Sequence, residues 1–172
     1  MEHTLANATA EQKIYLINQF LEAVRTTVYR QVQFAEFELY THGEINAGRS
    51  LQAENLENYW LESNKTYYGP ALTADKELAS EWSRIPHFYT PFYVYKYATG
   101  YSAANRFRRS NTQRQKKNAV EKYLGFLKAG GSDYSLNILK NAGVDLTTPQ
   151  PVAVTLQKFA QKVQELKTLL KL

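Results

Sequence analysis

The chain of 172 residues contains no cysteine and only three histidines, and both shortages limit the chemistry that it can carry. Without cysteine, the chain forms no disulfide and offers no thiolate as a nucleophile or metal ligand, so a metal site would need histidine, aspartate or glutamate. The histidines are His3, His42 and His87, and no two of them stand four residues apart, so the His-Glu-x-x-His pattern of helical zinc sites is absent. The residues alone therefore predict no metal site.

Long apolar runs are also missing. No stretch approaches the roughly eighteen continuous apolar residues that a membrane-spanning helix needs. Residues 1–5 lack the basic start and the apolar run of a secretory signal. The absence of cysteine fits a reducing compartment. Together these features predict a cytoplasmic protein without a membrane partner.

Apolar and aromatic residues, by contrast, are plentiful. Hydrophobic residues make up 44% of the chain and aromatic residues 13%, which is typical of globular and not of disordered proteins. The length suffices for one core or for two subdomains. No segment shows the sustained alternation of apolar and polar residues that a half-buried strand would show. We therefore expect an all-α fold, a bundle of several helices.

Apolar residues recur every three or four positions along most of the chain, which is the spacing of amphipathic helices. The pattern predicts helices over residues 11–40, 51–67, 74–82, 91–109, 111–128, 133–142 and 149–170. Glycines are expected to end three of them, at Gly43, Gly69 and Gly143. The expected N-caps are Thr9 or Asn7, Ser50, Thr73, Thr90, Ser132 and Thr148. The first helix also contains charges that need partners if they are buried, namely Arg25, Arg30, Glu36 and Glu38.

The net charge of +5 has a local source. Six basic residues fall within twelve positions: Arg106, Arg108, Arg109, Arg114, Lys116 and Lys117. Such a cluster could neutralise the phosphates of a nucleic acid. However, polar residues 110–113 interrupt it, and no aromatic side chain follows Phe107 within it to stack on bases. We therefore expect a solvated basic face and no nucleic-acid partner.

The stretch from residue 84 to residue 100 concentrates the polar aromatic side chains of the chain. One histidine and four tyrosines fall within eleven positions: His87, Tyr89, Tyr93, Tyr95 and Tyr97. Pro86 and Pro91 disfavour helix at the residues before them, which predicts a short extended segment over 87–90 and a helix that begins at Pro91. Imidazole and phenol groups donate hydrogen bonds without a full positive charge, which suits the stabilisation of an oxyanion. The alternative is that the tyrosines only pack in an amphipathic core.

Five segments, in order along the chain, carry a family likeness. They are Phe34-Ala35-Glu36-Phe37-Glu38, Arg84-Ile85-Pro86-His87-Phe88-Tyr89, Phe92-Tyr93-Val94-Tyr95-Lys96-Tyr97-Ala98-Thr99-Gly100, Phe126-Leu127-Lys128-Ala129-Gly130-Gly131-Ser132-Asp133-Tyr134 and Ala142-Gly143-Val144-Asp145-Leu146. Together they resemble the C-terminal part of the oligoendopeptidase F family. Its members are mostly helical zinc metallopeptidases, related to thimet oligopeptidase, that cleave short peptides inside a deep channel.

The resemblance implies roles for individual residues. In that family, a histidine and tyrosines of this region face the zinc across the cleft, where they help to bind the substrate and to stabilise the tetrahedral oxyanion. By this likeness, the catalytic residues are His87, Tyr93 and Tyr95, and the substrate-binding residues are Tyr89 and Tyr97. Glu36 and Glu38 match a family segment, and we expect them to have a structural role only.

The zinc ligands of the family precede the region that this chain resembles, and they are absent from it. We therefore expect residues 1–172 to be the C-terminal helical part of a catalytic domain whose parent enzyme binds zinc and short peptides. Alone, the chain is expected to bind no zinc and to be inactive. Surfaces that would face the missing N-terminal part should be exposed and should promote homo-oligomers. The alternative function is a non-enzymatic helical module that binds peptides or other partners.

Overall fold

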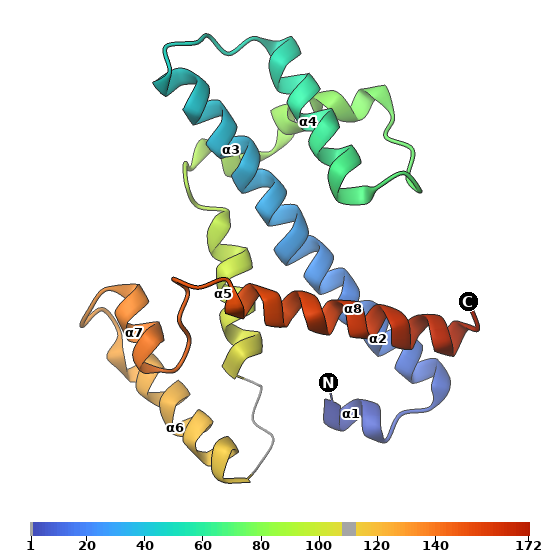
Figure 1. Cartoon of the computed structure of the whole chain (residues 1–172), viewed down its shortest axis with the longest axis vertical. Coiled ribbons are helices and arrows are strands. Elements are labelled where there is room, and N and C mark those ends of the chain that lie inside the picture. The colour runs from blue at the N-terminus through green and yellow to red at the C-terminus, as the bar shows by residue number, and fades with distance from the viewer. Residues whose placement is uncertain (1, 108–112) are drawn as a thin grey trace. The chain divides into compact units, whose positions relative to one another are not determined.

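The computed structural model describes the backbone of residues 2–107 and 113–172, and the side chains of these residues except for 2, 3 and 113–116. Every described element is helical and no strand occurs among them, which confirms the all-α prediction (Figure 1). The α-helices are α1 (Glu2–Ala6), α2 (Ala10–Val24), α3 (Arg30–Asn46), α4 (Ala53–Tyr68), α5 (Tyr95–Phe107), α6 (Gln113–Ala129), α7 (Ser135–Asn141) and α8 (Gln150–Leu170). A π turn, η1 (Arg25–Tyr29), joins α2 to α3, and two 3₁₀ segments, η2 (Lys76–Arg84) and η3 (Pro86–Tyr89), precede α5. Among the described helices, none combines the length and the apolar composition that a bilayer crossing requires.

The first long helical rod begins where the sequence predicts. The Thr9 side chain accepts a hydrogen bond from the Gln12 backbone at 3.3 Å, and the Gln12 side chain accepts one from the Thr9 backbone at 3.0 Å. This reciprocal pair is a capping box. The predicted stop at Gly43 is wrong, because α3 continues to Asn46 and the left-handed residue that follows is Gly48, with φ +74°. A glycine inside a helix costs only about 1 kcal/mol, so Gly43 alone does not end it.

Several other helix boundaries differ from the predicted ones. The N-cap residues of α4, η2 and α7 are Gln52, Asp75 and Tyr134, and not the expected Ser50, Thr73 and Ser132. None of the three observed N-cap residues makes a side-chain capping hydrogen bond. Thr148 also caps no helix, because its hydroxyl donates to the Asp145 carbonyl at 3.0 Å. Packing, and not the cap residue, therefore determines where these helices begin. Gly69 and Gly143 do adopt the positive φ of helix-ending residues, as predicted. The predicted helix limits at 109 and 111 lie outside the described residues.

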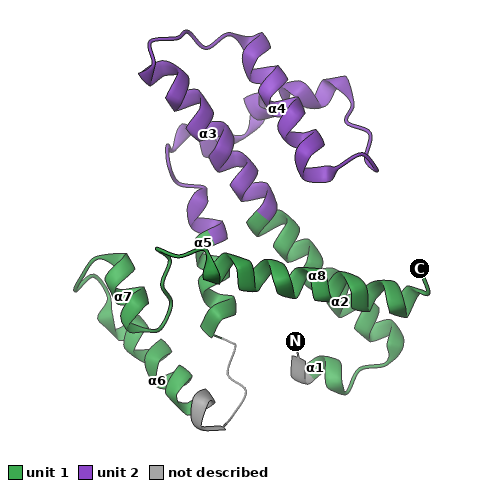
Figure 2. Ribbon diagram, in the orientation of Figure 1, with its two compact units in different colours: residues 1–28, 99–172 green, residues 29–98 purple. Residues whose placement is uncertain are grey.

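The chain divides into two compact units (Figure 2). Unit 1 comprises residues 1–28 and 99–172, and unit 2 comprises residues 29–98. Within unit 1, α2 packs along α8 although the two helices lie far apart in the sequence, and α6 packs on α7. The residues buried from α2 and α8 are Ile17, Phe20, Val24, Pro151 and Thr155.

Unit 2 is built around an aromatic core between α3, α4 and the residues that follow η2. Its buried members are Phe34, Phe37, Leu56, Trp60, Ile85 and Val94. The Trp60 side chain is fully buried, and its ring centroid lies 5.0 Å from that of Phe37 in an edge-to-face arrangement. Phe88, from η3, packs on the same cluster, with its ring centroid 5.2 Å from that of Phe37. The core therefore reaches directly to the residue that follows His87.

Candidate functional site

The segment that carries His87 is a 3₁₀ turn and not the short extended segment that the sequence predicts. Pro86 occupies the first position of η3, where its missing N–H costs nothing. Ile85 has the extended conformation that a residue before proline prefers, with φ −88° and ψ 108°. Pro86 thus restricts the backbone of Ile85, the residue before it, but does not restrict the residues after it, which form the turn. The Thr90 N–H donates to the His87 carbonyl at 3.1 Å and closes the turn.

The sequence predicts a helix that begins at Pro91, but in the structure this helix, α5, begins four residues later, at Tyr95. Pro91 and Phe92 form a turn instead, and Phe92 is left-handed, with φ +56°. A right-handed helix cannot pass through such a residue, so the cap-and-proline prediction at Thr90 is wrong. Tyr93 consequently lies before α5 and not on it.

The structure brings three of the five predicted site residues together. The ring centroids of Tyr93 and Tyr97 lie 5.7 Å apart, and those of Tyr97 and His87 lie 6.1 Å apart, both edge-to-face. We call His87, Tyr93 and Tyr97 the ring group. Tyr93 is 42% exposed and Tyr97 37% exposed, so neither ring is part of the buried core. The ring group therefore offers phenol groups to the solvent within unit 2.

His87 connects the ring group to the core of unit 2. Its imidazole is half-buried, and its centroid lies 6.1 Å from that of Phe34. The Nδ1 atom is buried and has no hydrogen-bond partner among the described residues. A buried ring nitrogen without a partner is uncommon and is a feature to be explained.

The other two predicted residues, Tyr89 and Tyr95, are exposed. Tyr95 is the first residue of α5. Tyr89 lines a pocket of about 220 Å³ within unit 2. Besides Tyr89, this pocket is lined by Phe37, Glu38, Thr41, His42, Leu51, Leu56, Trp82, Ser83, Ile85 and Phe88. The predicted site is thus split between the ring group, the pocket and the start of α5.

The surroundings of Tyr97 raise the pKa of its phenol. Desolvation is the largest cause that raises the pKa of Tyr97, followed by the charge of Tyr93 and a side-chain hydrogen bond with it. A phenol with a raised pKa stays neutral and can donate a hydrogen bond at neutral pH. The Lys96 ammonium lies 4.9 Å from the centroid of the Tyr93 ring, which is within the range of a cation–π interaction.

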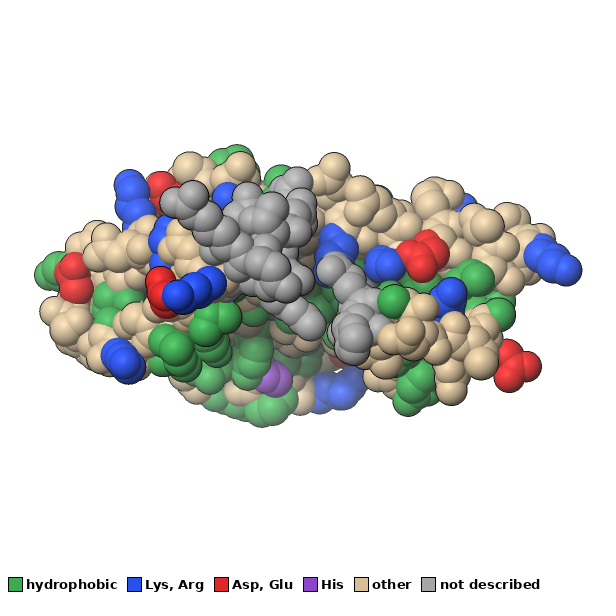
Figure 3. All heavy atoms as spheres, turned by 90° about the horizontal axis from the view of Figure 1, so that it is seen from below, with side chains coloured by type: hydrophobic (Ala, Val, Ile, Leu, Met, Phe, Trp, Pro, Cys, Tyr) green, Lys and Arg blue, Asp and Glu red, His purple; other side chains and the backbone are tan. Residues whose placement is uncertain are grey.

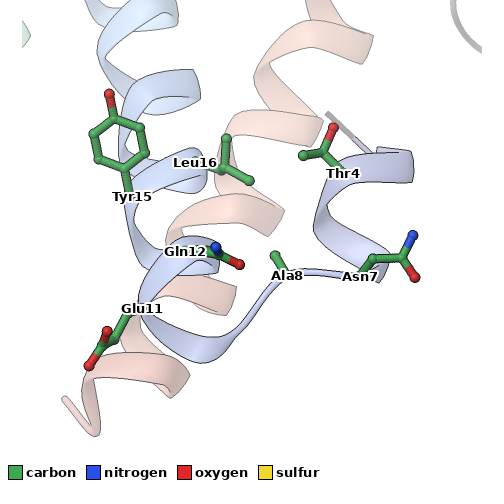
Figure 4. A pocket seen from close by; sticks show the side chains of 7 residues that line it. All are labelled: Thr4, Asn7, Ala8, Glu11, Gln12, Tyr15 and Leu16. Atoms are coloured by element: carbon green, nitrogen blue, oxygen red, sulfur yellow. The ribbon is translucent and has the colours of Figure 1, made fainter.

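Two larger hollows lie in unit 1. Figure 4 shows one of about 720 Å³, whose lining comes from α1, the segment after it and the first turns of α2. A second, of about 330 Å³, is apolar and lies between α5 and α6. Hydrophobic side chains also gather beside a histidine on the face of the molecule seen in Figure 3. Size alone therefore does not indicate the site.

The described residues do not supply a zinc site. No group of three or more histidines, cysteines, aspartates or glutamates within the described part of the chain lies close enough to hold a metal ion. This donor set does not fit a catalytic zinc, which needs three protein ligands. We therefore assign no step to a metal held by this chain.

The charged residues within the first long helical segment, α2 to α3, do interact with other residues, as we expect from the sequence. The Arg30 guanidinium pairs with Glu81, donates to Gln33 at 2.9 Å and lies 4.7 Å from the centroid of the Phe34 ring. Glu36 accepts a hydrogen bond from the Tyr67 hydroxyl at 2.8 Å. Glu81 and Tyr67 could not be predicted as partners, because they lie 51 residues from Arg30 and 31 residues from Glu36 along the chain.

Residues 1–158 match the model of Peptidase family M3. The chain therefore belongs to Peptidase family M3, which consists of zinc metallopeptidases. The resemblance to oligoendopeptidase F is confirmed.

Individual relatives give the same result. Oligopeptidase PepF of Bacillus subtilis (strain 168) is 46% identical over 170 residues, which cover 98% of this chain and 25% of that protein. Group B oligopeptidase PepB of Streptococcus agalactiae serotype III (strain NEM316) is 39% identical over 161 residues, or 92% of this chain and 26% of that protein. The crystal structure of oligoendopeptidase-F from Enterococcus faecium has a TM-score of 0.93 and 40% identity, and covers 99% of this chain and 33% of that one. The chain thus spans about a quarter of the length of the curated relatives.

Proposed function

We propose that residues 1–172 form the C-terminal helical part of the catalytic domain of a zinc metalloendopeptidase that hydrolyses short peptides. The observation that carries this proposal is the half-exposed ring group of His87, Tyr93 and Tyr97, in a chain that belongs to Peptidase family M3. The zinc ligands and the general base would come from the rest of the peptidase. The protein is expected to act in the cytoplasm.

In this proposal, the chain provides the wall of the cleft that binds the substrate. Tyr93 and Tyr95 donate hydrogen bonds to the carbonyl oxygen of the scissile peptide, and His87 completes the donor set. Such bonds strengthen as negative charge develops on that oxygen, which is how oxyanion donors lower a barrier. Tyr97 contacts both His87 and Tyr93 and so holds their rings, and its own phenol contacts the peptide. Tyr89 extends the contact surface toward its pocket.

Binding can be tested on the chain itself. A sample with ¹³C-labelled tyrosine rings is titrated with a short unlabelled peptide and followed by NMR. We expect the signals of Tyr93, Tyr95 and Tyr97 to shift, while Tyr15, which lies on α2 in unit 1, serves as the control and stays in place. Shifts confined to unit 1, or none at all, would contradict the proposal.

Inactivity of the chain alone is a second part of the proposal. The sequence carries no His-Glu-x-x-His pair, so it lacks the residues that hold and activate a zinc-bound water in that motif. We expect no cleavage of a short fluorogenic peptide with or without added zinc. Chelator-sensitive cleavage by the purified chain would show that this part is wrong.

The alternative is a non-enzymatic module that binds peptides through the same ring group. We retain this alternative because no set of metal ligands lies close together among the described residues. The DNA upstream of the first codon distinguishes the two. An in-frame His-Glu-x-x-His favours a peptidase whose zinc helix precedes this chain, and its absence favours the module.

The proposed partners follow from the same assignment. They are short peptides, the N-terminal part of the catalytic domain and a second copy of this chain. The last is expected because apolar side chains on α6 are exposed, and exposed apolar patches promote self-association.

A further inference from the structure

Phe92 occupies a conformation that needs support. Its φ of +56° is left-handed, which is uncommon and strained for a residue with a bulky side chain. The order of proline followed by a positive-φ residue resembles a type II turn, in which glycine or asparagine usually takes the second place. Something outside the turn must therefore stabilise phenylalanine there.

That support comes from α3. The Phe92 N–H donates a hydrogen bond to the Glu38 carboxylate, with 2.6 Å between the nitrogen and Oε1. Glu38 is only 5% exposed. A carboxylate buried to this extent is unfavourable unless it has a hydrogen-bond partner, so the Phe92 amide and the Glu38 carboxylate stabilise each other.

A second contact comes from the same face of α3. His42 lies one helical turn after Glu38, and its imidazole centroid is 4.6 Å from that of the Phe92 ring. Glu38 thus holds the backbone of Phe92, and His42 contacts its side chain. Residues 47–89 separate α3 from this turn in the sequence, so only the fold brings them together.

We propose that Glu38 is a positioning residue, which fixes the Phe92 turn and thereby orients Tyr93 against Tyr97 and His87. Tyr93 follows Phe92 directly, so any rotation at Phe92 displaces the Tyr93 ring. Because Tyr93 contacts Tyr97 and Tyr97 contacts His87, the displacement disturbs the whole ring group. That this orientation serves peptide binding depends on the proposed function, but the orientation itself does not.

Two variants and one control separate this role from general stability. Glu38→Ala removes the acceptor, whereas Glu38→Gln keeps a side-chain carbonyl in nearly the same place. Glu36→Ala is the matched control, because Glu36 stands on the same helix and binds Tyr67 instead of the loop. Far-UV circular dichroism establishes that each variant is folded.

The first readout is hydrogen exchange at the Phe92 amide, measured by NMR on the 172-residue chain. We expect the wild-type amide to exchange about tenfold or more slowly than an open turn amide, since bonds to charged acceptors are among the stronger ones. Protection should be lost in Glu38→Ala, largely restored in Glu38→Gln and unchanged in Glu36→Ala. A wild-type amide without protection would overturn the proposal, and this measurement requires no variant to fold.

The second readout is the nuclear Overhauser effect between the Tyr93 and Tyr97 rings. It should be present in the wild type, Glu36→Ala and Glu38→Gln, and lost in Glu38→Ala. A ring contact that survives in folded Glu38→Ala would overturn the positioning role.

Peptide binding then links the inference to the proposed function. The dissociation constant of a short peptide should rise about tenfold in Glu38→Ala and stay at the wild-type value in Glu36→Ala. If the wild-type tyrosines do not respond to peptide at all, the proposed function fails, while amide exchange and the ring contact still decide the role of Glu38.

Discussion

Unit 2 buries the rings and aliphatic chains of Phe34, Phe37, Leu56, Trp60, Ile85 and Val94 to between 0 and 8% exposure. In unit 1, by contrast, α6 leaves Val120, Leu124 and Leu127 between 45 and 56% exposed, although these residues share one helix face. Unit 2 thus has a closed aromatic core of its own, whereas the apolar face of α6 is available for contacts.

Removal of a core ring should have the largest effect. Trp60→Ala deletes a fully buried indole that contacts Phe34, Phe37 and Phe88, and should lower the free energy of unfolding by about 3–5 kcal/mol. Leu124→Ala on α6 should change it by less than about 0.5 kcal/mol. Urea unfolding followed by far-UV circular dichroism measures both. Equal effects of the two variants would contradict the contrast between the units.

The Arg30–Glu81 pair should come next. Arg30→Ala leaves Glu81 mostly buried, with the exposed Arg84 as its remaining ion partner among the described residues, and also removes the cation stacked on Phe34 and Trp60. We expect a loss of about 2 kcal/mol, less than for a fully buried pair. Arg25→Ala breaks an exposed pair with Glu22 and should cost less than about 1 kcal/mol. The same urea series decides between them, and a larger effect of Arg25→Ala would show that burial of the pair is not what matters.

Alkaline pH should weaken unit 2 through its tyrosines. Desolvation, and then the hydrogen bond to Glu36, raises the pKa of Tyr67, and the pKa values of Tyr29 and Tyr59 are raised by the same loss of solvent. When the pKa is higher in the folded state, the folded protein keeps the proton up to a higher pH than the unfolded chain does. The stabilisation is therefore complete below the unfolded pKa of about 10 and is lost as the pH rises toward the folded-state pKa.

Tyr67→Phe should flatten this loss, because phenylalanine cannot titrate. The free energy of unfolding is measured between about pH 8 and pH 11, because this range brackets the pKa of tyrosine in the unfolded state. Tyr134→Phe, at an exposed residue of unit 1, is the control and should leave the slope unchanged. A slope that Tyr67→Phe does not reduce would show that Tyr67 is not the group responsible.

Self-association through α6 should be the weakest effect. We expect light scattering at high protein concentration to show oligomers, and the double variant Leu124→Lys and Leu127→Lys to shift the equilibrium toward the monomer. The matched control is Leu39→Lys, at an exposed leucine of α3 in unit 2. A wild-type chain that stays monomeric throughout would contradict the expectation.

Helix positions were predictable where the signal is local. The capping box at Thr9 and the glycine stops at Gly69 and Gly143 each depend on residues within a few positions, and the structure contains all three. The prediction failed at Thr90 and Pro91 for the opposite reason. There a hydrogen bond to Glu38, 54 residues away, accompanies a left-handed Phe92, and local cap chemistry does not decide the outcome.

The candidate site was predictable in its residue types but not in its arrangement. Spacing placed Tyr93, Tyr95 and Tyr97 together on one helix, yet Tyr93 precedes the helix and contacts Tyr97 from the turn. His87 was expected beside the tyrosines, and its contact with Tyr97 agrees with that. The catalytic and binding roles of these residues remain predictions.

The two tryptophans of the chain, Trp60 and Trp82, both lie in unit 2, and the Phe37 ring lies within 6 Å of each. Indole emission from this protein therefore comes from unit 2 alone. A fluorescence melt will record the loss of the aromatic core, while the helical signal of the whole chain sums both units. Two transitions at different temperatures would show that the units unfold independently, and the chain provides the optical probe for that measurement without any added label.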